Sequence, residues 1–134
     1  MEPGTSPRVV TTKRKVIYRE SSWNVHQFEV WSGELVCRMV ALKMEESLML
    51  WLGGEGPAAL GELALGMPAA GVAQGALATR LLAGGGDAAP LALRVAAGLL
   101  RPVFVCSSLP LDRFSAPLVE RGLAMEIKTR PQCF

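Results

Sequence analysis

The sequence predicts an α+β domain: a mostly antiparallel sheet of about six strands, with two helices on one face and the other face, or an edge, used for dimerisation. Three observations predict this class. The chain has 134 residues, half of them apolar, which suits a single core without a second domain. Residues 23–52 alternate short apolar runs with turn residues, as strands do. After residue 86, apolar residues recur every fourth position, which is the period of a helix face.

The first three strands are expected within residues 23–52. Trp23–Trp31 ends at Ser32-Gly33, where glycine supplies the positive φ of a tight hairpin turn before the second strand, Leu35–Lys43. Glu45–Ser47 forms the next turn. Leu48–Leu52 then follows as a third strand that is apolar on both faces.

Residues 60–82 are open to two interpretations. Leu60–Met67 and Val72–Leu82 are predicted as the fourth and fifth strands. Helices are the alternative, because both segments are rich in alanine and leucine.

Two helices are predicted around a sixth strand. Asp87 is a good N-cap for a helix over Asp87–Arg101, and Pro102 ends that helix because the residue before a proline disfavours the α region. Val103–Cys106 is a short apolar strand, and Ser115–Lys128 is the second helix. The predicted order is a five-strand meander followed by helix, strand and helix.

Both faces of the predicted sheet are apolar. The second, third and sixth strands lack the alternation expected of an antiparallel sheet with one face in water. Two helices cover only one face, and no further element is predicted for the other. The sequence therefore predicts that another protein covers it.

The chain divides into three predicted segments: a flexible basic tail over residues 1–21, a single domain over 22–130 and a short C-terminal tail over 131–134. The basic run Lys13–Lys15 is interpreted as a solvated charge run, with a weak nuclear-import signal as the alternative.

Composition excludes several partners and compartments. A net charge of +2 gives little attraction for nucleic acid. Glycines and a proline interrupt the longest uncharged stretch, so no membrane contact is expected. No export signal is apparent, and Cys37, Cys106 and Cys133 have no paired spacing. We therefore expect free thiols and a cytoplasmic protein, with the nucleus as a second compartment.

No group of residues supports catalysis. Cys106 would need His26, the one histidine, as its base, and a buried structural cysteine is the preferred interpretation. Gly84–Gly86 precedes a helix as phosphate-binding loops do, yet no lysine follows and Asp87 places negative charge at that site. We expect no enzyme, no cofactor and no metal site.

Several motifs, in order, resemble one family. They are Val25-His26-Gln27-Phe28, Ser47-Leu48-Met49-Leu50-Trp51-Leu52-Gly53, Thr79-Arg80-Leu81-Leu82, Val103-Phe104-Val105-Cys106-Ser107 and Leu118-Val119-Glu120-Arg121. Over roughly residues 24–127, the chain is similar to the proteasome assembly chaperone 4 family. The resemblance implies a small non-catalytic chaperone without a cofactor. It also implies pairing with proteasome assembly chaperone 3 and contact with proteasome α-subunits, to guide assembly of the 20S α-ring.

Two other classes remain as alternatives. A roadblock-like or profilin-like dimeric scaffold would also leave a sheet edge or face for a partner. An enzyme based on Cys106 and His26 ranks third.

The candidate partner-contacting residues centre on the third strand: Phe28, Val40, Leu50, Trp51 and Leu52. Trp51 points away from the face that carries Leu50 and Leu52, since neighbouring strand residues alternate. Both faces are equally apolar, so the sequence does not determine which one meets the helices.

Overall fold

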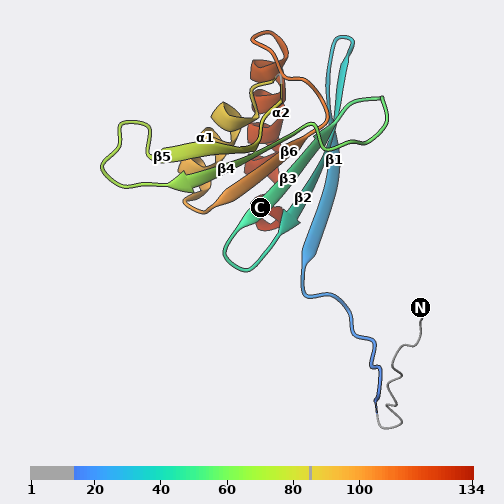
Figure 1. Cartoon of the computed structure of the whole chain (residues 1–134). Coiled ribbons are helices and arrows are strands. Elements are labelled where there is room, and N and C mark those ends of the chain that lie inside the picture. The colour runs from blue at the N-terminus through green and yellow to red at the C-terminus, as the bar shows by residue number, and fades with distance from the viewer. Residues whose placement is uncertain (1–13, 85) are drawn as a thin grey trace, which may run out of the picture.

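The computed structural model describes residues 14–84 and 86–134, and it confirms the predicted fold class: six strands form one sheet beside two helices (Figure 1). The elements are β1 (Asn24–Ser32), β2 (Leu35–Lys43), β3 (Leu48–Gly53), β4 (Glu62–Pro68), β5 (Ala76–Leu82), α1 (Ala88–Leu99), β6 (Val103–Ser107), α2 (Ser115–Thr129) and the 3₁₀ turn η1 (Pro131–Cys133). Residues 60–82 are therefore largely strand, and the helical alternative is wrong.

The predicted meander is wrong. The strand order is β1-β2-β3-β6-β4-β5, with β6 inserted between β3 and β4. It runs parallel to β3 and antiparallel to β4. The physical reason is that four of the five residues of β6 are apolar. A central position gives both edges of this strand a hydrogen-bonded neighbour and places Val103 and Val105 in the core.

Both helices lie on the same face of the sheet (Figure 1). α1 packs on β4, β5 and β6, and α2 packs beside β1. A glycine allows each helix to approach the sheet closely. A Cβ at Gly66 of β4 would lie 2.2 Å from the carbonyl oxygen of Ala92, and one at Gly122 of α2 would lie 2.5 Å from Cγ1 of Val30.

The N-terminus of α1 is capped from the sheet. Asp87 occupies the N-cap position as predicted, but its side chain makes no capping hydrogen bond. Glu62 of β4, only 5% exposed, instead accepts hydrogen bonds from the backbone N–H groups of Gly86 at 2.5 Å and Ala88 at 3.3 Å. A Cβ at Gly84 would lie 2.2 Å from Cγ of Glu62. A carboxylate of the chain itself therefore occupies the place that an anion would take at this helix terminus.

Residues 131–134, predicted as a short C-terminal tail, pack against the rest of the chain. Phe134 is 1% exposed and meets the rings of His26 and Phe28 edge-on, each at a centroid distance of 5.9 Å. Its carbonyl oxygen accepts a hydrogen bond from Arg101. The segment is part of the domain because it fills the space between β1 and α2.

The predicted basic tail falls mostly outside the described residues. Of that segment, residues 14–21 are described; they form neither helix nor strand and are exposed. No helix within residues 14–84 and 86–134 has the length and apolar character needed to span a bilayer.

Candidate partner interface

One face of the sheet carries no helix, and its side chains form two apolar rows. The pairing register places Leu42, Met49, Phe104 and Leu65 side by side across the four central strands. The adjacent row holds Val40, Trp51, Cys106 and Leu63. We call these eight residues the open face.

No element within residues 14–84 and 86–134 covers the open face. Seven of its side chains are half-buried and Cys106 is 9% exposed, which reflects contact among neighbours on the sheet. None of the eight belongs to the core that packs against the helices. A contiguous apolar surface is typical of an interaction site in soluble proteins.

Trp51 lies flat on the sheet. A Cβ at Gly53, two residues further along β3, would come within 2.0 Å of Cη2 of Trp51, so the indole ring covers that glycine. The ring thus presents a broad aromatic surface near the middle of the open face, with Val40 and Cys106 paired on either side.

The rim beside β1 is polar. Nε of Arg38 lies 3.2 Å from Oε2 of Glu29 on the neighbouring strand, and Nε1 of Trp31 donates to Oε1 of Glu29 at 3.0 Å. Trp31 is 69% exposed at this edge. An apolar centre with a polar rim is the usual arrangement of a protein–protein interface.

The predicted interface residues separate onto opposite faces. Val40 and Trp51 lie on the open face. Leu50 and Leu52 are fully buried against the helices, and Phe28 stacks on His26 at a centroid distance of 5.3 Å on that same side. Partner contact stays a prediction for all five residues, and Val40 and Trp51 are the two that lie on the face without helices.

Sequence reasoning missed most of the open face. Met49 shares a face with Trp51 by the two-residue period of a strand, so that signal was present. Leu63, Leu65 and Phe104 join the same surface only through the β3–β6–β4 pairing, which periodicity alone does not reveal.

The alternative catalytic pair is not assembled. Cys106 lies on the open face, whereas His26 lies on the helix side of β1. Burial raises the pKa of the Cys106 thiol, which disfavours the reactive thiolate. Within the described part of the chain, no three His, Cys, Asp or Glu residues gather as a metal site, and all three cysteines are unpaired.

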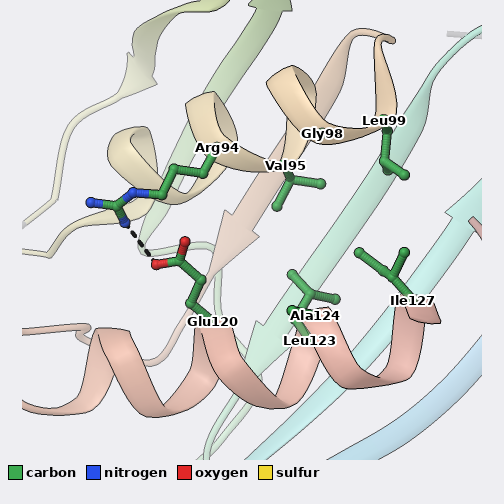
Figure 2. A pocket seen from close by; sticks show the side chains of 8 residues that line it. All are labelled: Arg94, Val95, Gly98, Leu99, Glu120, Leu123, Ala124 and Ile127. Carbon is green, nitrogen blue, oxygen red and sulfur yellow. Dashed lines mark hydrogen bonds and ion pairs between the residues drawn. The ribbon is translucent and has the colours of Figure 1, made fainter. Parts of the chain in front are cut away.

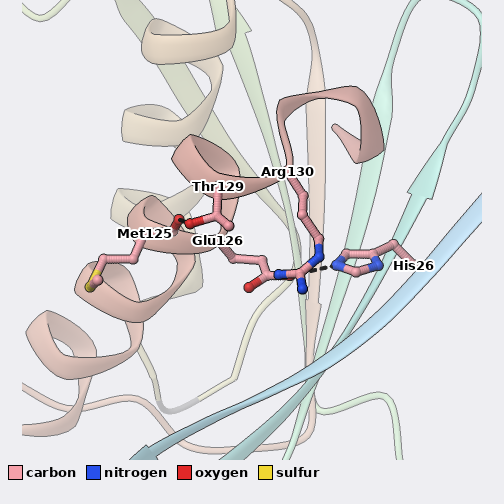
Figure 3. A network of polar contacts seen from close by, with 5 residues as sticks. All are labelled: His26, Met125, Glu126, Thr129 and Arg130. Carbon is pink, nitrogen blue, oxygen red and sulfur yellow. Dashed lines mark hydrogen bonds and ion pairs between the residues drawn. The ribbon is translucent and has the colours of Figure 1, made fainter.

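His26 instead joins the edge strand to α2 (Figure 3). Its Nε2 lies 2.7 Å from Oε2 of Glu126, and Nη1 of Arg130 lies 3.1 Å from the same oxygen. This contact gives the histidine a structural role in holding β1 beside the helix.

The fold and its uncovered face define a class: a small α+β subunit with an apolar sheet surface available to another chain. Comparison with known families then gives a match to the one described as proteasome assembly chaperone 4, over residues 37–109. That range is more than half of the chain and includes the whole open face. The chain belongs to the proteasome assembly chaperone 4 family.

The fold is also found among solved structures. One chain of a yeast chaperone complex for 20S proteasome assembly superposes with a TM-score of 0.55 at 16% sequence identity, covering 82% of this chain and 94% of that one. At this identity the match shows a shared fold. Comparison with curated proteins gives no match.

Proposed function

We propose that this chain is a non-catalytic chaperone for assembly of the 20S proteasome α-ring, and that it acts as a heterodimer with proteasome assembly chaperone 3 through its open face. Family membership supports the chaperone role. The fold shared with a chain of a yeast chaperone complex supports assembly with a second chaperone chain. The single observation that carries the mode of pairing is the uncovered block of eight apolar side chains.

Physical chemistry favours a stable rather than a transient pairing. Leaving four central strands apolar on their outer side costs solubility unless a partner removes that surface from water. A second sheet packed face to face would bury it about 10 Å away, as in a sandwich of two sheets. The flat indole of Trp51 and the neighbouring Phe104 are the aromatic types enriched at interface centres.

Such a chaperone needs no reacting group. It binds, positions and later releases a subunit, so the separation of Cys106 from His26 is consistent with its role. We propose the cytoplasm as its compartment, with the nucleus as a second one.

Affinity capture of the tagged chain from cell lysate, followed by mass spectrometry, tests this function. We expect proteasome assembly chaperone 3 and proteasome α-subunits among the bound proteins. Trp51→Glu should lose chaperone 3, because it places a charge at the centre of the open face. Val16→Glu is the matched control, since Val16 is 69% exposed and lies before the sheet. Recovery of trafficking or motor components instead of proteasome proteins would favour a dimeric scaffold and contradict the proposal.

A further inference from the structure

A groove separates the two helices on the side of the sheet opposite the open face (Figure 2). Its walls are apolar and comprise Val95, Gly98 and Leu99 of α1 with Leu123, Ala124 and Ile127 of α2. An ion pair between Arg94 and Glu120, 2.7 Å apart, joins the helices at one end. The volume of the groove is about 240 Å³. An apolar cavity of ~150 Å³ accepts a benzene ring, and small-molecule clefts begin near ~300 Å³, so this groove fits one leucine or phenylalanine side chain.

Gly98 keeps the mouth of the groove open. Glycine is a poor helix former, and only proline is worse in a helix interior. A Cβ at Gly98 would meet nothing within 4 Å, in contrast to Gly66 and Gly122, where it would clash. No packing contact within the described residues therefore explains this glycine. Ala124, also small and exposed, lines the other side of the groove. Both residues allow another chain to approach closely.

Two basic side chains lie on α2 beside Ala124, which lines the groove. Arg121 and Lys128 lie three residues before and four residues after Ala124, so all three share one side of α2. Both are exposed, and neither forms an ion pair with another described residue. The two carboxylates of α2 are already engaged, Glu120 by Arg94 and Glu126 by both His26 and Arg130. The available charge therefore favours an acidic ligand.

We propose that this groove binds an acidic segment of a proteasome α-subunit that the chaperone escorts. One leucine or aromatic side chain of that segment enters between Gly98 and Ala124, and a neighbouring carboxylate lies over Arg121 and Lys128. This inference rests on the proposed function. Binding of an α-subunit in the groove and binding of chaperone 3 on the open face can occur together. The groove and the open face lie on opposite sides of the sheet, so chaperone 3 leaves the groove accessible.

The test measures binding of the intact heterodimer with chaperone 3 to recombinant proteasome α-subunits, one subunit at a time. Gly98→Leu fills the groove, and we expect the Kd for the bound subunit to rise at least tenfold. Gly98→Ala is the matched control, because a methyl group improves the helix and leaves most of the groove empty; its Kd should stay within twofold. The double variant Arg121→Glu and Lys128→Glu should weaken binding at least tenfold and reduce its salt dependence. Arg80→Glu on β5 reverses one positive charge away from the groove, and it should have little effect. The single variants Arg121→Glu and Lys128→Glu, which each make the same change of charge as Arg80→Glu, should each weaken binding.

The outcomes separate this inference from the proposed function. If the parent heterodimer binds an α-subunit and both the Gly98→Leu and the charge-reversal heterodimers bind it equally well, the groove is not the site and the inference is overturned alone. If the parent heterodimer forms but binds no α-subunit, the proposed function and this inference both fail. Loss of heterodimer formation in Gly98→Leu would also overturn the inference, because the groove would then serve pairing with chaperone 3.

Discussion

Trp51 and Leu50 are neighbours in β3 with opposite expected roles, so one pair of alanine variants tests which face binds. Leu50 is fully buried against the helices, and Leu50→Ala should lower the free energy of unfolding by about 2–5 kcal/mol. Trp51 is half-buried on the open face and rests mainly on Gly53. Because it leaves no closed cavity, Trp51→Ala should lower the free energy of unfolding by only about 1 kcal/mol.

The binding effects should be reversed. An aromatic residue at the centre of an interface contributes about 2 kcal/mol or more when truncated. Trp51→Ala should therefore raise the Kd for chaperone 3 by about 30-fold or more. Leu50→Ala should leave the Kd nearly unchanged at temperatures where the variant is folded.

Two measurements on each variant test which face binds chaperone 3. Urea unfolding, followed by circular dichroism at micromolar concentration, gives the free energy of unfolding, and calorimetric titration with chaperone 3 gives the Kd. If Trp51→Ala loses as much unfolding free energy as Leu50→Ala and keeps the parent Kd, the open face is not the binding surface. If Trp51→Ala changes neither quantity, the central position of β3 is also contradicted.

Three further predictions concern the cap of α1, the thiol of Cys37 and the N-terminal segment. Glu62→Ala should lower the free energy of unfolding by about 1–3 kcal/mol, because buried N–H groups of Gly86 and Ala88 lose their acceptor; an unchanged urea midpoint would contradict this. Burial raises the pKa of the Cys37 thiol from its ordinary 9.0 to about 11, so the folded state keeps a proton that the unfolded state releases. Stability should then be unaffected by this group below pH 9 and fall between pH 9 and 11, and a Cys37→Ala variant should show a smaller fall over that range. Deleting residues 1–20 should leave the melting temperature and the affinity for chaperone 3 unchanged, because residues 14–20 are exposed and add no strand; a large drop in either would show that the segment packs or pairs.

The local part of the fold could be predicted from the sequence. The bounds of Leu35–Lys43 are confirmed at both ends, since Ser32-Gly33 and Glu45–Ser47 mark its turns. Both helices are confirmed within two residues at either end, because a four-residue apolar period and nearby prolines define them. These features depend on neighbours in sequence, and local chemistry determines them.

Long-range features could not be predicted. The insertion of β6 beside β3 depends on which strand edges pair, and hydrophobic period carries no information on that choice. The cap of α1 comes from Glu62, which lies 26 residues from Ala88 in the chain. Apolar residues occur on both sides of β3, so the sequence does not show that Leu50 and Leu52 face the helices while Trp51 faces away from them. That assignment depends on where the helices pack.

Light scattering of the chain purified alone, and after co-expression with proteasome assembly chaperone 3, tests the central claim most directly: the open face exists to be covered by a second chaperone chain. We predict a single soluble species of 1:1 stoichiometry after co-expression, and self-association or poor solubility of the chain alone. A monodisperse monomer of the isolated chain at high concentration, with no complex after co-expression, would contradict the claim.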